Sequence, residues 1–172
     1  MNTPFTIAPA SIDDAPLVLE FIRELAEYEK LLHEVEADED TVRENMFAPD
    51  APTRVLIARA GGFPAGFAVY FYNFSTFAGC KGLYLEDLFV RPRYRGHGIG
   101  RGLMMECVRI ARETGCGRMD WAVLDWNKPS IAFYESLGAV VRPDWRICRL
   151  DTKALDDLAS GSMKKPPAAF EI

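Results

Sequence analysis

The most constraining feature of the chain is an apolar strand that runs directly into a glycine- and arginine-rich turn. The strand is GLYLEDLFV at residues 82–90, and the turn is RPRYRGHGIGRG at residues 91–102, which holds four arginines and four glycines. A helix is predicted over residues 99–114, and its apolar residues fall on one face: Ile99, Leu103, Cys107 and Ile110. The first turn of such a helix leaves backbone N–H groups unpaired at its positive end. Glycines let an anion approach these groups closely, so the pattern predicts a phosphate site.

The rest of the chain predicts strands and helices around a single sheet. Strands are expected at residues 5–10, 54–60, 64–75, 82–90, 118–124 and 144–151. Helices are expected at residues 12–30, 39–47 and 99–114, from Asn127 to Gly138, and weakly at 152–159. This order predicts a mixed α/β (α+β) domain with a central sheet flanked by helices. We expect one domain over residues 5–158 and a flexible tail over residues 159–172.

Composition excludes several classes of protein. The 172 residues, 49% of them apolar and 26% charged, are typical of one soluble globular domain. No apolar run is long enough to span a bilayer, and the N-terminus lacks the pattern of a secretory signal. The four cysteines show no CxxC spacing, which indicates reduced thiols in a cytoplasmic protein. The two histidines, His33 and His97, have no Cys or His partner at ligand spacing, so no metal site is expected.

The charges of the chain are segregated. Residues 20–50 hold eleven acidic and three basic residues, and residues 91–118 hold seven arginines and two glutamates. A solvated face explains most single surface charges. Two opposite blocks in one small domain nevertheless favour two ligands, one anionic and one cationic.

Three phosphate-binding patterns compete for the glycine-rich turn. The P-loop pattern fails because Gly100 is followed by Arg101 and Gly102, and the dinucleotide pattern GxGxxG finds no third glycine. The pattern Arg/Gln-x-x-Gly-x-Gly/Ala is matched in full by Arg95, Gly98 and Gly100. This match resembles the pyrophosphate-binding signature of the GNAT superfamily of N-acetyltransferases, which use acetyl-CoA. The resemblance implies that these residues hold the cofactor: Arg95, Gly96, His97, Gly98, Ile99, Gly100 and Arg101.

Three further stretches narrow the resemblance to one branch. LYLEDLFV, WNKPSIAFYESLGA and IRELAEYEK are similar to the diamine (spermidine/spermine) N-acetyltransferases, and the similarity covers roughly residues 5–158. It implies transfer of an acetyl group from acetyl-CoA to a primary amine by direct attack in a ternary complex. The expected acceptor is small and polycationic or lysine-like, such as a polyamine or thialysine. The short loop at residues 61–64 and the segment RMDWAV differ from the animal enzymes, so the chemistry is better determined than the acceptor.

The chemistry requires a proton acceptor and a proton donor. Freeing an alkyl amine at pH 7 costs about 4.6 kcal/mol, and the resemblance implies Glu86 as the carboxylate that takes the proton. Asp87 is expected on the opposite side of the strand, and both carboxylates could instead only bind the cation. Tyr134 is the expected acid for the departing thiolate, because a phenol of pKa near 10 is neutral at pH 7. Its alternative role is that of a packed helix aromatic.

The resemblance also implies the remaining contacts. The backbone of Leu88, Phe89 and Val90 would pair with the pantetheine arm as an added strand, while Asn127 and Ser130 form a second coenzyme contact. The expected amine site comprises Tyr28, Glu29, Glu86, Asp87, Asp120 and Trp121. The segment around Trp145 is expected to form a homodimer, although its apolar residues could equally be core.

Three rival functions remain open at this stage. A protein lysine or N-terminal acetyltransferase would need a wide acceptor groove. A non-catalytic acyl-CoA sensor would need neither Glu86 nor Tyr134, and both are present. Nucleic-acid binding is disfavoured because the chain carries a net charge of -5, and no membrane partner is expected.

Overall fold

A computed structural model describes residues 4–162 of the 172-residue chain. The chain falls into two compact units, residues 1–122 and residues 123–172, which are described separately below. The predicted tail at residues 159–172 lies largely outside the described residues, and the domain limits of 5–158 remain a prediction.

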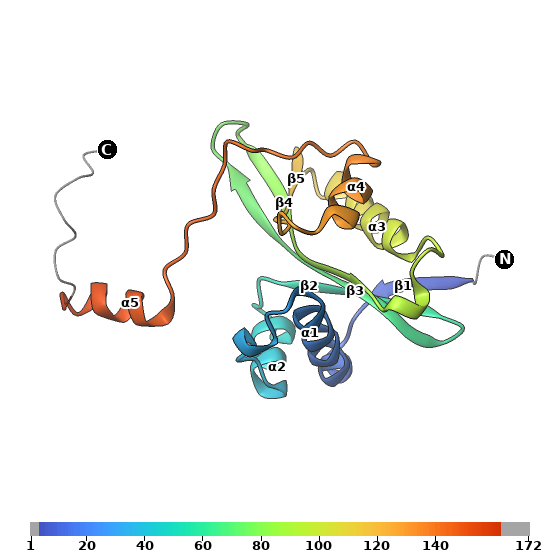
Figure 1. Cartoon of the computed structure of the whole chain (residues 1–172), viewed down its shortest axis with the longest axis horizontal. Helices are drawn as coiled ribbons and strands as arrows, with labels where there is room; N and C mark the ends of the chain where they lie inside the picture. Colours follow the sequence, from blue (N-terminus) through green and yellow to red (C-terminus); the bar gives the residue numbers. More distant parts are fainter. Residues whose placement is uncertain (1–3, 163–172) are drawn as a thin grey trace. The chain divides into compact units, whose positions relative to one another are not determined.

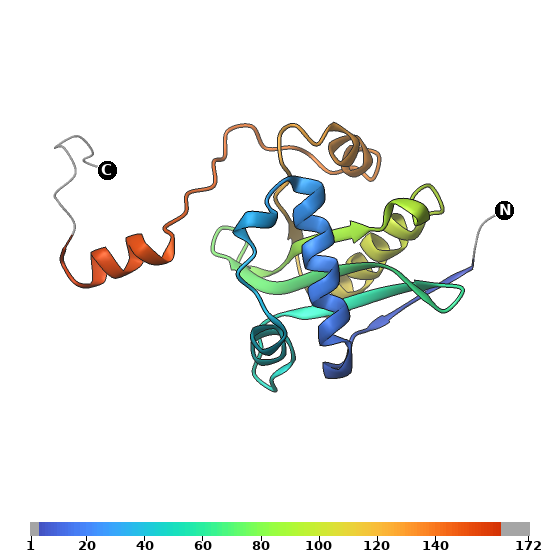
Figure 2. The ribbon, with the colours of Figure 1, turned by 60° about the horizontal axis from the view of Figure 1, so that its bottom comes forward.

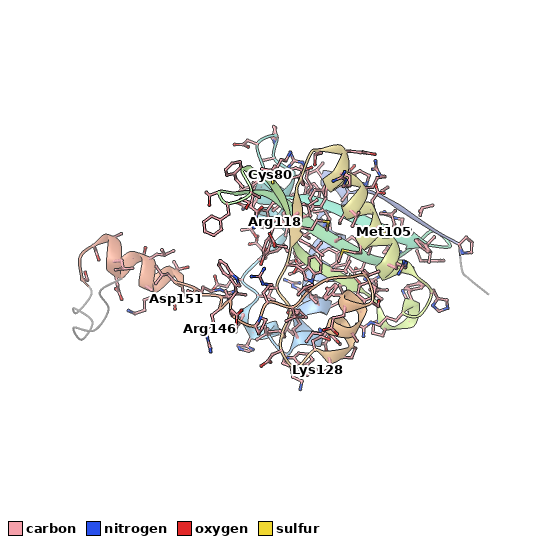
Figure 3. All side chains as sticks on the ribbon, turned by 90° about the horizontal axis from the view of Figure 1, so that it is seen from above. Cys80, Met105, Arg118, Lys128, Arg146 and Asp151 are labelled. Atoms are coloured by element: carbon pink, nitrogen blue, oxygen red, sulfur yellow. The ribbon has the colours of Figure 1, made fainter. Side chains whose placement is uncertain are left out.

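The first unit is built on a mixed five-stranded sheet, as the sequence predicted. Its strands are β1 (Phe5–Pro9), β2 (Arg54–Ala60), β3 (Phe63–Ser75), β4 (Cys80–Val90) and β5 (Arg118–Asp120), in the order β1-β2-β3-β4-β5. Neighbouring strands are antiparallel except β4 and β5, which are parallel. The parallel pair requires a crossover, and the glycine-rich turn and its helix supply it. In Figure 3, the labelled Cys80 and Arg118 mark the neighbouring starts of β4 and β5.

Helices cover both faces of this sheet. Helices α1 (Ala15–Glu29) and α2 (Glu39–Phe47) lie on one face, and α3 (Ile99–Glu113) lies on the other (Figure 1). Figure 2 shows α1 running across its face of the sheet. A short 3₁₀ turn precedes α1, and a capping box forms there between Ser11 and Asp14. The backbone N–H of Ser11 donates to the Asp14 carboxylate over 2.9 Å.

Large apolar side chains fix α1 and α3 to the sheet. On the α1 face, the Phe21 ring stacks on Phe67 at a centroid distance of 5.1 Å. On the α3 face, a Cβ added at Gly102 would lie 2.7 Å from the Phe5 ring. Gly102 therefore lets α3 approach β1 closely, and the start of α3 is held at a fixed distance from the sheet.

The second unit contains two short helices, α4 (Lys128–Glu135) and α5 (Thr152–Ala159). The strand predicted at residues 144–151 is not formed, and the one predicted at 118–124 is only three residues long in β5. Figure 3 shows Arg146 on the extended segment that precedes α5, and Asp151 at the start of that helix. Alternation alone predicted the missing strand, but a strand also needs a hydrogen-bonded neighbour. No helix within residues 4–162 has the length and apolar character needed to cross a membrane.

Candidate active site

The turn after β4 has the backbone geometry of an anion site. Gly96 and Gly98 have positive φ angles of 78° and 83°, and Gly98 is the N-cap of α3. A Cβ added at either glycine would meet nothing within 4 Å, so the space beside this backbone is open. The amides of the first turn of α3, beginning at Ile99, have no carbonyl acceptor within the helix. Open space and exposed amide donors together fit a phosphate group.

The four arginines of the turn do not share one role. Arg91 is 9% exposed and forms ion pairs with Glu20 at 2.7 Å and Glu24 at 2.8 Å. Its Nη1 also donates to the carbonyl of Pro64 over 3.1 Å, and its guanidinium lies over the Phe21 ring. Arg91 therefore ties α1 to the end of β4, and its charge is neutralised inside the protein.

Arg95 links the turn to the opposite face of the sheet. Its Nε donates to the carbonyl of Val90 over 2.9 Å, and its guanidinium lies 4.7 Å from the Tyr28 ring centroid and 5.7 Å from that of Phe89. The ring nitrogen Nδ1 of His97 lies 2.9 Å from the carbonyl oxygen of Arg95. Arg101 is exposed in the first turn of α3. Contacts of these residues with a cofactor remain a prediction, but the structure joins the predicted phosphate turn to predicted amine-site residue Tyr28.

The second half of β4 has a strand neighbour on one side. Strand β5 pairs only with Gly82, Leu83 and Tyr84, whereas β3 pairs along the whole of β4. Within the described part of the first unit, no strand pairs with the β5-side edge of residues 85–90. This open edge includes Leu88, Phe89 and Val90, and the backbone of an extended ligand can add to such an edge.

A β-bulge lies at Glu86 and interrupts the alternation of side chains along β4. Val69 of β3 pairs with Asp87, and the next residue, Tyr70, pairs with Leu85, so Glu86 has no partner of its own. Val69 belongs to the apolar cluster under α1, so its partner Asp87 also faces α1. The sequence predicted that Glu86 and Asp87 face opposite sides of the sheet. The extra residue places Leu85 and Asp87 on opposite sides, whereas strict alternation would place them on the same side; the side on which Glu86 lies remains a prediction.

The carboxyl groups of Glu29, Glu86 and Asp87 lie close enough to interact. Burial raises the pKa of Asp87 to about 7, and the neighbouring charges of Glu86 and Glu29 add to the effect. Burial also raises the pKa of Glu29. Glu86 itself is exposed. Of the two neighbouring carboxylates, Asp87 is the partly buried one.

Tyr84 extends this acidic group toward β5. It lies opposite Asp120 in the parallel ladder. Burial raises the pKa of Tyr84, and the charges of Glu86 and Asp120 raise it further. Asp120 also forms an ion pair with Arg118 at 2.7 Å, and Trp121 follows directly after the strand. The structure thus brings together four of the six predicted amine-site residues, and Tyr28 lies one position before Glu29 in α1.

A cavity of about 610 Å³ adjoins this region. It extends along α1 and the end of β4, and its lining includes Glu20, Glu24, Glu27, Tyr28, Phe89, Arg91, Pro92, Arg93 and Arg95. Phe89 is two residues from Asp87 on the same face, but Glu29, Glu86 and Asp87 are not among the residues that line the cavity. Both acidic and basic side chains line the cavity.

The second unit carries the other predicted site residues. Asn127 is 5% exposed and caps α4, where its Oδ1 accepts the backbone N–H of Ser130 over 3.3 Å. Tyr134 is partly buried, and its ring centroid lies 5.3 Å from that of Phe133. The cap role of Asn127 is therefore present, whereas the coenzyme and acid roles remain predictions. Among residues 4–162, no three His, Cys, Asp or Glu side chains are placed to hold a metal ion.

The sequence reasoning missed two features of this region. It counted Arg91 in the basic block of residues 91–118 without predicting its partners Glu20 and Glu24, which lie on one face of α1, four residues apart. It also passed over Tyr84, which stands two residues before Glu86. A tyrosine near two consecutive carboxylates in an otherwise apolar strand was the available signal.

Comparison with known proteins agrees with this geometry. The model of the Acetyltransferase (GNAT) family matches residues 19–139. A thialysine N-epsilon-acetyltransferase of Bos taurus is 36% identical over 164 residues, covering 89% of this chain and 96% of that protein. A human spermidine/spermine N(1)-acetyltransferase-like protein is 33% identical over 165 residues, covering 90% of this chain and 24% of that protein.

A solved structure shares the fold. An integron cassette protein from the mobile metagenome of V. cholerae superposes with a TM-score of 0.77 at 29% identity, covering 92% of this chain and 98% of that one. The family match spans the anion turn, the open edge of β4 and α4. The chain therefore belongs to the GNAT acetyltransferase family, and it is an acetyl-transfer enzyme of a family that uses acetyl-CoA as cosubstrate.

Proposed function

We propose that this enzyme acetylates a primary amine on a small cationic or lysine-like molecule, by direct attack on acetyl-CoA in a ternary complex. The observation that carries the proposal is the convergence of Glu29, Glu86 and Asp87 at the bulge of β4. Carboxylates whose charges interact in this way attract an alkyl ammonium group. They also adjoin the strand edge along which the acyl donor would lie.

The proposed donor site uses the backbone of the turn. Amides from Gly96 to Arg101 would bind the pyrophosphate, because the glycines leave their amides accessible and α3 presents its positive end there. The edge formed by Leu88, Phe89 and Val90 would pair with the pantetheine arm, and one of its N–H groups would polarise the acetyl carbonyl. Asn127 and Ser130 would supply the second coenzyme contact implied by the family resemblance.

Tyr134 is the proposed acid. Its phenol would give a proton to the coenzyme A thiolate as the C–S bond breaks, and a phenol is neutral at physiological pH. Replacing Tyr134 with Phe should lower kcat by about 100-fold and leave the Kd for acetyl-CoA nearly unchanged. An unchanged kcat would remove Tyr134 from the mechanism.

The proposed acceptors are thialysine, lysine and polyamines. A relative named for thialysine and another named for spermidine and spermine support both kinds of molecule. The test is a panel of thialysine, lysine, spermidine, spermine and a lysine-containing peptide, with release of free thiol from acetyl-CoA as the readout. We expect turnover with at least one of the small amines. Turnover of the peptide alone would favour the rival function, protein acetylation, and no turnover at all would contradict the proposal.

We also propose that the enzyme is a homodimer and acts in the cytoplasm. Trp145 and Ile147 are 71% and 73% exposed, and apolar surface of this kind favours a protein partner. Replacing Trp145 with Glu should convert dimer to monomer in sedimentation analysis, and a wild-type monomer would contradict the proposal. The cysteines Cys80, Cys107, Cys116 and Cys148 are all free, which supports a reducing compartment.

A further inference from the structure

We propose that Asp87, rather than Glu86, accepts the proton that the acceptor amine loses before it attacks. The inference rests on the proposed acetylation of an amine and assigns one of its steps to a specific side chain. It follows from the position of the bulge, from the charges around Asp87 and from its place next to the open edge of β4.

The bulge decides which carboxylate faces the interior. Asp87 pairs with Val69, which is 2% exposed, and lies two residues from Phe89, which is 5% exposed. Both neighbours belong to the apolar cluster under α1, so Asp87 is partly buried on that side. Glu86 is the unpaired residue of the bulge and is exposed. Of the two neighbours in sequence, only Asp87 is in an environment that disfavours a bare negative charge.

The charges that face Asp87 increase this preference. Glu29 interacts with Asp87 from α1 and Glu86 from β4 itself, while the residue of β3 that pairs with Asp87 is the apolar Val69. Burial and these two like charges raise the pKa of Asp87 from 3.8 to about 7. A carboxylate with this pKa accepts a proton from an ammonium group roughly a thousandfold more favourably than an ordinary aspartate does.

Asp87 also lies where the proton is lost. It directly precedes Leu88, and adjacent Cα atoms are about 3.8 Å apart. The backbone from Leu88 to Val90 forms the open edge that is proposed to hold the acyl donor. An amine held between Glu29, Glu86 and Asp87 would therefore lie next to the thioester.

The proposed step balances as follows. The bound ammonium transfers one N–H proton to the Asp87 carboxylate, and the free nitrogen lone pair attacks the thioester carbonyl carbon. As the C–N bond forms and the C–S bond breaks, the nitrogen loses a second proton and the thiolate takes one up. Asp87 then returns its proton to water. The sum is one ammonium and one thioester converted to one amide, one thiol and one proton.

The test measures kcat and KM for the best amine of the panel between pH 6 and pH 9, at saturating acetyl-CoA. For Asp87→Asn we expect kcat at pH 7 to fall about 100-fold or more, with KM for the amine changed less than about threefold. The remaining kcat of Asp87→Asn should rise about tenfold per pH unit, because the amine must then lose its proton to solvent. Circular dichroism and the Kd for acetyl-CoA check that the variant is folded.

Two neighbouring variants serve as matched controls. Glu86→Gln and Glu29→Gln should each keep the fall of kcat at low pH, here called the acidic limb of the pH profile. The midpoint of this limb should move to lower pH, because each variant removes a negative charge that raises the pKa of Asp87. A structural or purely cation-binding role would not move this midpoint. The proposal is overturned if Asp87→Asn raises KM but keeps kcat, or if Glu86→Gln is the variant that abolishes the limb.

A direct titration separates this inference from the proposed function. Carbon-13 NMR of the carboxyl groups should show one group with a pKa near 7 that is missing in Asp87→Asn. The absence of that group would overturn the assignment even if the enzyme acetylates amines. Its presence in an enzyme that acetylates no amine would contradict the proposed function, and with it the role of Asp87 as a base.

Discussion

The two halves of β4 differ in what surrounds them, although they form one continuous strand. The first half, from Cys80 to Leu85, lies next to β3 throughout and next to β5 from Gly82 to Tyr84. Its apolar side chains are fully buried, with Leu83 at 0% and Leu85 at 1% exposure. The second half begins with the bulge at Glu86, pairs only with β3, and places two consecutive carboxylates in an apolar strand.

This difference indicates that the first half of β4 serves mainly stability and the second half serves mainly the proposed chemistry. The first half buries apolar surface and satisfies its backbone within the sheet, which stabilises the fold. The second half leaves an edge open and holds Asp87 where its charge is disfavoured, both of which cost stability. Removing a buried apolar side chain from the first half should therefore lower stability, whereas removing the charge of Asp87 from the second half should raise it.

Leu85→Ala should have the largest effect on stability. Removing a fully buried leucine leaves a cavity, and the expected loss is about 3 kcal/mol in the free energy of unfolding. Urea denaturation measures it, and kcat per folded molecule should change little. Leu88→Ala in the second half is the control; it removes a partly buried side chain and should cost less. Equal losses for the two variants would contradict the division of the strand.

Asp87→Asn should stabilise the protein, and more strongly at high pH. The folded pKa of about 7 lies above the unfolded value of 3.8, so the folded state binds the extra proton and wild-type stability falls as pH rises toward and through 7. Asparagine carries no charge, so its gain over wild type should be about 2 kcal/mol larger at pH 8 than at pH 5. Thermal unfolding at both pH values measures this gain. A constant gain would show that Asp87 is not the perturbed group. Glu86→Gln should give a smaller gain of the same sign, because it removes only one of the charges that raise the pKa of Asp87.

Much of this architecture could be predicted from the sequence because it depends on local signals. Helical spacing and the Ser11 capping box located α1, and the match of Arg95, Gly98 and Gly100 located the turn before α3. Positive φ angles at glycines are local too, since few other residues adopt them. These features need no information about distant parts of the chain.

The parts that could not be predicted depend on pairing between distant strands. Nothing in YLEDLFV marks a bulge, since it is set by how β3 aligns with β4, and it reverses the side on which Asp87 lies. The strand expected at residues 144–151 failed for a related reason, because an alternating pattern does not supply a neighbouring strand. The ion pairs of Arg91 join residues 67 or more positions apart. Roles that depend on contacts with ligands remain predictions in both units.

Gly98→Val tests the turn that continues from the second half of β4. At a φ of 83°, a β-branched residue is strained, and we expect a stability loss of about 1–2 kcal/mol. The added side chain would also fill the open space beside the amides of α3, so the Kd for acetyl-CoA should rise at least about tenfold. Calorimetry measures the affinity. Gly61→Val is a matched control, because Gly61 has a φ of 57° and open space in the turn between β2 and β3. Equal loss of affinity in both variants would refute the placement of the phosphate.

The smallest expected effect concerns the contact that joins the end of β4 to α1. Arg95 lies over the Tyr28 ring at 4.7 Å, and a partly exposed cation–π pair contributes about 0.5–1 kcal/mol. A double-mutant cycle with Arg95→Gln and Tyr28→Leu, measured by urea denaturation, should give a coupling energy in this range. Arg95→Gln also loses the hydrogen bond to the Val90 carbonyl, both with Tyr28 present and with Leu in its place. The contribution of this bond therefore cancels in the coupling energy.

The neighbouring pair of Arg93 and Tyr94 is a matched control for this measurement. Its centroid distance is similar, 4.9 Å, but the two residues are adjacent in sequence and join no separate elements. Their coupling energy should be smaller, because adjacent residues stay close in the unfolded chain and gain less from folding. If the Arg95–Tyr28 coupling were zero, this contact would not link α1 to the phosphate turn, and only the ion pairs of Arg91 would. In that case Arg95→Gln should leave the KM for the amine unchanged. If the two residues are coupled, Arg95→Gln should raise both the KM for the amine and the Kd for acetyl-CoA.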